Sequence, residues 1–314
     1  MKNTFKNGVK AGLQTTWTLG KVIFPITILV GILQHTPVLQ YITNFIAPVM
    51  GIFGLSGEAA IPLVVGNFLN LYAGIGAILT LDLTVKEVFI LAMMLSFSHN
   101  LLVESTVAAR VGIKIWIILV VRLGLAFFSG IIINLVWQGG SEQAQYGLIA
   151  PKEEVITGFF PIVFDAFQRG ILGIVQLAII VIPLMVAVQF MKDLGWLNAF
   201  SKKMAPFTRM LGMKENTSMT LAAGLTIGLA YGAGVMIQAV KEDNVSKKDI
   251  TLAFIFLVAC HAVVEDTLVF IPLGIPVWPL LIIRVVTAIV LTMVIAQVWK
   301  RMELAKRKEA TYEH

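Results

Sequence analysis

The chain has 314 residues, of which 58% are hydrophobic and only 13% are charged. Together with a mean hydropathy of +0.87, this composition excludes an ordinary soluble domain and predicts an integral membrane protein. The net charge of +6 does not indicate nucleic-acid binding, because the basic residues gather beside the ends of apolar segments. The single cysteine, Cys260, excludes a disulfide framework within the chain. We therefore expect membrane lipids, and no nucleic acid, as partners.

Apolar segments follow one another along the chain, and most are close to the length of about 20 residues that crosses a bilayer. They are 17–34, 59–81, 88–107, 113–137, 171–190, 217–240, 250–271 and 279–299. Two shorter segments, 38–53 and 195–212, are interrupted by Pro48 and Pro206. They predict amphipathic helices that lie at the membrane interface.

The chain also contains an internal duplication. Gly, Pro, His, acidic and Arg residues recur in the same order, displaced first by 158 positions and then, after a four-residue insertion, by 162. The matched pairs include Ala47-Pro48 and Ala205-Pro206, Gly54 and Gly212, Leu71 and Leu229, His99 and His261, Glu104 and Asp266, Gly112 and Gly274, and Arg122 and Arg284. Paired repeats in a membrane chain are typical of transporters with a central site. We expect a first repeat at 1–137, an external linker at 138–166, a second repeat at 167–302 and a cytoplasmic tail at 303–314.

Equivalent loops of the two repeats carry opposite charge. Residues 36–58 contain no Lys or Arg, whereas residues 191–216 contain five. Because positive residues favour the cytoplasm in short loops, these loops are predicted to lie on opposite sides of the membrane. Both chain ends are basic, so we expect a multi-pass cell-membrane protein whose N- and C-termini are cytoplasmic.

This topology fits only if one apolar segment in each half does not cross the membrane. The Gly-rich segments 59–81 and 217–240 are the candidates, because Gly permits chain reversal and irregular backbone is tolerated in membranes where protein buries it. The predicted hairpin hinges are Gly66, Gly74, Gly76, Gly224, Gly232 and Gly234. The predicted fold is all-α integral membrane, an inverted-topology structural repeat in which each half has three transmembrane helices, a re-entrant helical hairpin and an interfacial helix. Eight crossings with parallel repeats are the alternative that the charges disfavour.

Ionisable residues inside membrane spans are costly and are usually functional. The first repeat contains His99, Asn100 and Glu104, and the second contains His261, Glu265 and Asp266. Arg122 and Arg284 are the predicted counter-charges: Glu104 would pair with Arg122, and Glu265 or Asp266 with Arg284. Two interpretations of these groups stay open: they are substrate ligands, or they are ion pairs that lock helices together. A His beside a carboxylate also suits proton coupling.

No metal or catalytic centre is predicted, because no His-x-x-Glu-His or phosphate-loop pattern occurs. We expect no enzyme and no cofactor, with H⁺ or Na⁺ as the candidate coupling ion. Polar residues at the hairpin tips are stronger binding candidates, because a helix broken inside protein offers free backbone donors and acceptors. The predicted substrate-binding residues are Asn67, Asn70, Tyr72, His99, Asn100, Glu104, Tyr231, His261, Glu265 and Asp266.

The sequence resembles the nucleoside-recognition, or Gate, domain family. The resemblance rests on Gly57-Glu58-Ala59-Ala60-Ile61-Pro62, on Gly66-Asn67-Phe68-Leu69-Asn70, and on Ser98-His99-Asn100 followed by Glu104. Relatives of that domain include concentrative nucleoside transporters, the membrane part of the ferrous-iron transporter B and the spore maturation proteins A and B. The resemblance implies two inverted units whose helices are broken near the midplane and between which a solute moves.

The favoured function is therefore a secondary-type permease that moves a small polar or amphiphilic solute, nucleoside-like or ionic, through a midplane site between two inverted repeats. A lipid translocase or scramblase is one alternative. A non-transporting membrane scaffold or sensor that acts with a partner protein is another. A homodimer is a further candidate assembly, because small residues along 124–130 offer a helix-packing face.

Overall fold

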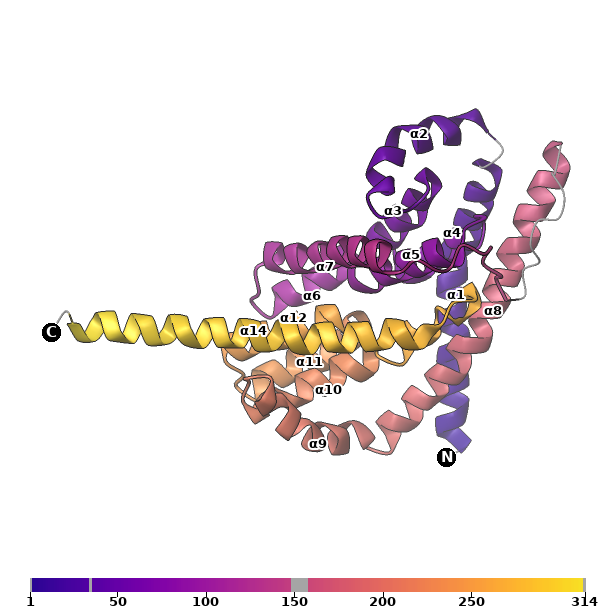
Figure 1. Ribbon diagram of the computed structural model, residues 1–314. Coiled ribbons are helices and arrows are strands. Elements are labelled where there is room, and N and C mark those ends of the chain that lie inside the picture. Colours follow the sequence, from indigo (N-terminus) through magenta and orange to yellow (C-terminus); the bar gives the residue numbers. More distant parts are fainter. Residues whose placement is uncertain (1, 34–35, 148–157, 313–314) are drawn as a thin grey trace. The chain divides into compact units, whose positions relative to one another are not determined.

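The computed structural model describes residues 2–33, 36–147 and 158–312, and its regular elements in these ranges are helices (Figure 1). The α-helices are α1 (Lys2–Leu33), α2 (Pro37–Gly51), α3 (Ala60–Phe68), α4 (Leu71–Ile78), α5 (Val85–Ser98), α6 (Leu101–Arg110), α7 (Ile115–Val136), α8 (Phe159–Asp193), α9 (Trp196–Met210), α10 (Ser218–Ile227), α11 (Leu229–Glu242), α12 (Lys247–Ala259), α13 (Glu265–Leu268) and α14 (Val277–Tyr312). Short 3₁₀ turns are η1 (Gly57–Ala59), η2 (Glu215–Thr217) and η3 (Ile271–Leu273). The all-helical part of the predicted fold is confirmed.

Five helical stretches of the described chain are long and apolar enough to cross a membrane, by length and composition. They are Lys2–Leu33, Val85–Arg110, Ile115–Val136, Phe159–Met191 and Val277–Leu304. The expected span 250–271 is not one continuous helix, because α12 ends at Ala259 after 13 residues and α13 contains only four. A sixth crossing through this broken stretch stays a prediction.

The Gly-rich segments are interrupted, as predicted. Segment 59–81 forms α3 and α4, of nine and eight residues, and segment 217–240 forms α10 and α11, of 10 and 14 residues. Each helix is shorter than a bilayer span of about 20 residues. Re-entry of these helix pairs from opposite membrane sides stays a prediction.

Two helices extend into the segments that the sequence assigns to the linker and to the tail. Helix α8 begins at Phe159, so the last part of the expected linker 138–166 is helical. Residues 159–166 contain Phe159, Phe160, Val163 and Phe164 and no Gly, and this apolar run extends the following span. At the other end, α14 continues through the expected tail as far as Tyr312.

The chain divides into two compact units, and each contains parts of both repeats. Unit 1 comprises residues 1–102, 122–193 and 264–281, whereas unit 2 comprises 103–121, 194–263 and 282–314. The compact units therefore do not coincide with the two repeats, whose expected bounds stay a prediction. A segment that follows His99 belongs to unit 2, and the equivalent segment that follows His261 belongs to unit 1.

Within unit 1, α1 and α8 lie side by side and antiparallel (Figure 1). Gly8 faces Val186 and Gly12 faces Ile182, and a Cβ atom added at either glycine would come within 2.8 Å of the facing Cα atom. Glycines spaced by four residues allow helix backbones to approach closely in membranes. This approach explains why the chain carries glycine inside a long helix, where it otherwise weakens helix formation.

Helix α4 is buried along its whole length, and α5 and α12 are buried along most of theirs. Residues Val88–Ser98 of α5 and Asp249–Ala259 of α12 are all buried. By contrast, Ile282, Val286, Val290, Val294 and Val298 form an exposed apolar stripe along α14. Such a stripe on a span-length helix is suited to contact with lipid chains.

Candidate functional site: two broken helices with buried polar groups

The first helix break of unit 1 lies between α3 and α4. Leu69 leaves the helical conformation, and Asn70 is extended and caps α4, where its side chain accepts a hydrogen bond from the Ala73 amide at 2.9 Å. Gly66 and Gly74 face each other across this hairpin, and a Cβ atom on Gly74 would lie 3.1 Å from the Gly66 Cα. These glycines therefore permit close packing of the two helices, whereas Leu69 and Asn70 form the turn.

The second break of unit 1 lies at the end of α5. The backbone of His99 is extended, and Asn100 adopts a left-handed conformation with φ of 54° before α6 begins. The Asn100 amide donates to the Gly66 carbonyl at 2.9 Å. This hydrogen bond joins the α5–α6 break to the hairpin, so the two irregular stretches support each other.

Arg122 occupies the space beside this break and is completely buried. Its Nε donates to the Phe97 carbonyl at 2.8 Å, and its Nη2 donates to the His99 carbonyl. A helix that ends inside the protein leaves backbone carbonyls without helical partners, and a cation at its C-terminus also opposes the partial negative charge there. Arg122 therefore stabilises the broken end of α5.

Unit 2 repeats two main contacts of this arrangement. The Ala262 amide donates to the Gly224 carbonyl at 3.0 Å, which matches the bond from Asn100 to Gly66. Arg284 is completely buried and donates from Nη2 to the His261 carbonyl at 2.7 Å. The hairpin turn is supplied by Gly228, whose φ of 86° favours glycine. The duplication in the sequence is thus also a duplication of contacts.

Both histidines are oriented by the helix that precedes them. His99 Nδ1 lies 2.7 Å from the Leu95 carbonyl, and His261 Nδ1 lies 2.8 Å from the Leu257 carbonyl. Because a carbonyl oxygen only accepts hydrogen bonds, Nδ1 carries the proton in each ring. Nε2 is therefore the nitrogen that is left to contact other groups.

In unit 2, that nitrogen faces a carboxylate from the first repeat. His261 Nε2 lies 3.3 Å from Glu104 Oε1, and the two side chains are only 2% and 4% exposed. Since Nδ1 of His261 already donates to a carbonyl, the contact with Glu104 requires a proton on either Nε2 or the carboxyl group. The pair is thus a buried site for one transferable proton.

Unit 1 contains the symmetry-related pair, His99 and Asp266. A ring nitrogen of His99 and a carboxylate oxygen of Asp266 lie within 4.8 Å of each other, and both residues are buried. Asp266 follows Glu104 by 162 positions, as His261 follows His99. Each unit therefore joins a histidine of one repeat to an acid of the other.

A third polar contact has no counterpart. Tyr72 donates its hydroxyl hydrogen to Glu265 Oε1 within unit 1. At the equivalent positions of the other repeat the chain carries Ala230 and Val103, which cannot form such a bond. Tyr72 and Glu265 thus distinguish the two otherwise similar motifs.

The structure brings together most of the predicted site residues and places a few elsewhere. Asn67 lies on α3, and its Oδ1 is buried without a hydrogen-bond partner among the described residues. Tyr231 lies on α11, but its side chain is outside the described part of the structure. The glycines predicted as hinges lie inside α3, α4, α10 and α11 instead of at the breaks: Gly66, Gly74, Gly76, Gly224, Gly232 and Gly234.

The predicted ion pairs of Glu104 with Arg122, and of Glu265 or Asp266 with Arg284, would each join residues of different units and stay predictions. The contacts of the arginines with the His99 and His261 carbonyls were not anticipated. The equal spacing of His99 and Arg122, and of His261 and Arg284, is the sequence signal that could have suggested them.

These observations define a helical membrane protein with a duplicated broken-helix motif, and comparison with known proteins agrees. Residues 16–114 and 174–275 match the Gate family, described as nucleoside recognition, and the chain belongs to that family. It is also 67% identical over 301 residues to a Bacillus subtilis (strain 168) protein described as uncharacterized membrane protein YvoD. The match covers 96% of each chain. No solved structure matches the chain.

Proposed function

We propose that this Gate-family protein is a secondary-type permease that moves a small polar or amphiphilic solute. The observation that carries this proposal is the pair of buried helix breaks, each with a histidine beside a carboxylate. Ionisable groups and irregular backbone are expensive inside a membrane protein unless they line a solute or ion pathway. Discontinuous helices of this kind form the substrate and ion sites of many transporters.

The proposed architecture is an inverted repeat with re-entrant hairpins. The repeated contacts of Gly66 with Asn100 and of Gly224 with Ala262 support the duplication. The opposite charge of equivalent loops supports the inversion. Substrate contacts would come from the polar groups at the breaks, and Tyr72 with Glu265 would make the two halves chemically unequal.

A proton is the proposed coupling ion, with Na⁺ as the alternative. Glu104 and His261 hold a proton between them, and histidine exchanges protons near neutral pH. Binding or release of that proton changes the charge of a buried pair. A proton gradient would thereby shift the equilibrium between conformations of the surrounding helices.

The test is solid-supported membrane current in proteoliposomes, with nucleosides and metal ions offered under a pH or Na⁺ gradient. Glu104→Gln is expected to lower the substrate-dependent current about tenfold or more, because a charge-assisted hydrogen bond contributes about 1.5–3 kcal/mol. Glu215→Gln is the matched control, since Glu215 is exposed and pairs only with Arg209 on the surface among the contacts described.

Silence of the wild-type protein across all solutes, or a Glu104→Gln variant that carries full current, would contradict the proposal. The same vesicles distinguish the lipid-translocase alternative. If the protein moves lipids between leaflets, fluorescent lipids in vesicles that contain the protein would be reduced faster than in protein-free vesicles.

A further inference from the structure

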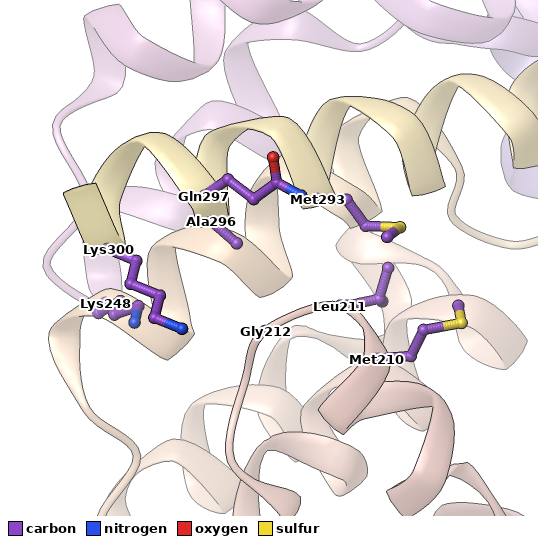
Figure 2. Close-up of a pocket in the computed structure, with 8 residues that line it drawn as sticks. All are labelled: Met210, Leu211, Gly212, Lys248, Met293, Ala296, Gln297 and Lys300. Atoms are coloured by element: carbon purple, nitrogen blue, oxygen red, sulfur yellow. The ribbon is translucent and has the colours of Figure 1, made fainter.

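A hollow of about 140 Å³ opens on unit 2, away from the helix breaks (Figure 2). It is lined by Met210, Leu211, Gly212, Lys248, Met293, Ala296, Gln297 and Lys300. Most of its wall is apolar, and the two lysines lie at the same end of it in Figure 2. Lys248 is half-buried and Lys300 is exposed. The hollow thus combines an apolar wall with two positive charges.

The repeat supplies an internal comparison for this hollow. Lys86 is the counterpart of Lys248, and Asn134 is the counterpart of Ala296, both displaced by 162 positions. Gly54 packs against Asn134 as Gly212 packs against Ala296, with a Cβ atom on Gly212 lying 2.8 Å from that of Ala296. The same two walls therefore exist in unit 1.

In unit 1, the chain itself fills the equivalent place. Helix α7 ends at Val136, and the segment that follows folds back over the start of α5. The Lys86 amide donates to the Gly140 carbonyl at 2.8 Å, and the Val85 amide donates to the Glu142 carbonyl at 2.9 Å. The Lys86 ammonium donates to the Asn134 carbonyl at 3.0 Å. Carbonyl oxygens of the chain thus accept hydrogen bonds from the two amides and from the ammonium group at this position.

In unit 2, helix α14 continues to Tyr312 and does not fold back. Among the described residues, no carbonyl or carboxylate takes the place of Gly140 and Glu142. Asp249 does not replace them, because it is buried at the start of α12 and accepts from the Ser246 hydroxyl at 2.7 Å. The hollow is therefore the open counterpart of a place that is occupied in the first repeat.

We propose that this hollow binds the headgroup of an anionic phospholipid. Its phosphate would lie between the ammonium groups of Lys248 and Lys300, and the upper acyl chain would lie along Met210 and Met293. Lys300 lies near the end of the candidate span Val277–Leu304, where lysine side chains reach toward the interface. Basic pockets between membrane helices are suited to anionic headgroups. This site is independent of the proposed transport.

The test is native mass spectrometry of the full-length protein titrated with phosphatidylglycerol. Each lysine near a membrane surface contributes enough for about a fivefold change in affinity. Lys248→Ala with Lys300→Ala should therefore weaken the tightest binding by about 25-fold. Lys202→Ala with Lys203→Ala is the matched control, because it removes the same charge from exposed positions of α9 in the same unit.

Three results would overturn the proposal. They are an equal loss of affinity in the control, equal binding of phosphatidylcholine, and displacement of the lipid by millimolar inorganic phosphate, which would indicate a site for soluble anions. If the double alanine variant does not fold, Lys248→Arg with Lys300→Arg and each single alanine variant replace it. Retention of binding by the arginine variant and loss in the single variants would support the site, and equal affinity in all of them would contradict it.

Discussion

At the scale of single residues, Arg122 and Arg284 have the clearest structural role. Both are completely buried: Arg122 donates to the Phe97 and His99 carbonyls, and Arg284 donates to the His261 carbonyl. A planar guanidinium can serve two acceptors at once, which lysine cannot do in the same geometry. The arginines therefore stabilise the helix ends that carry His99 and His261.

Arg122→Gln is expected to lower the thermal stability of the detergent-solubilised protein. The substitution removes donors from the Phe97 and His99 carbonyls, and each lost bond to a charged group corresponds to about 1.5–3 kcal/mol. Arg110→Gln is the control, because Arg110 is exposed on α6. Equal melting temperatures of the two variants, measured by intrinsic fluorescence, would refute this role.

Tyr146 provides a test of pH dependence outside the membrane-spanning helices. Burial raises the pKa of its phenol above the usual value of about 10. Because the folded state favours the protonated form, its stabilisation is complete below about pH 10 and is lost as the pH rises further. Tyr146→Phe should therefore retain more stability than the wild type between about pH 10 and 11. The exposed Tyr41→Phe variant should follow the wild type, and the same alkaline loss in Tyr146→Phe would contradict the prediction.

At the scale of helices, the contact between α1 and α8 depends on the absence of side chains. Gly8 and Gly12 lie against the backbone of Val186 and Ile182, where even a methyl group would force a shift. Close packing of this kind replaces the hydrophobic driving force that is missing between helices in lipid.

Gly12→Leu is expected to destabilise the protein by about 1–3 kcal/mol, because overpacking forces the backbones apart. Gly124→Leu is a matched control on α7, since a Cβ atom at Gly124 meets nothing within 4 Å. Thermal unfolding in detergent measures both variants. A stable Gly12→Leu protein would show that α1 and α8 do not pack closely.

The sequence predicts some helix breaks and not others, for physical reasons. The breaks at Asn70 and Gly228 are local, because a capping side chain or a positive φ defines them. By contrast, the sequence predicts a continuous span where the structure has the break after α12, since Cys260–Val264 contains neither Gly nor Pro. Two tertiary contacts stabilise this break. The Ala262 amide donates to the Gly224 carbonyl, and the Arg284 guanidinium donates to the His261 carbonyl.

The same distinction applies to the candidate site. Composition and the repeat identified His99, Glu104, His261 and Asp266 as the important polar groups. Their partners were not predictable, because helical spacing relates residues on one helix and the pairs join different repeats. The His261 contact with Glu104 requires the tertiary fold, in which residues 103–121 belong to unit 2.

At the scale of the whole molecule, the two repeats are interdependent. Each compact unit contains the histidine break of one repeat and the acid of the other, so neither repeat completes its own polar pair. This exchange explains why the motif occurs twice in one chain. Entry of the two halves from opposite sides of the membrane stays a prediction, which rests on the opposite charges of equivalent loops.

Cysteine accessibility tests the inverted duplication most directly. Ser56 and Lys214 are exposed and occupy equivalent positions of the two repeats, 158 residues apart. In a Cys260→Ser background, which removes the only native thiol, a membrane-impermeant maleimide applied to intact cells should label Ser56→Cys and not Lys214→Cys. Labelling of Lys214→Cys should require permeabilised cells. If both positions react from the same side of the membrane, the repeats are not inverted.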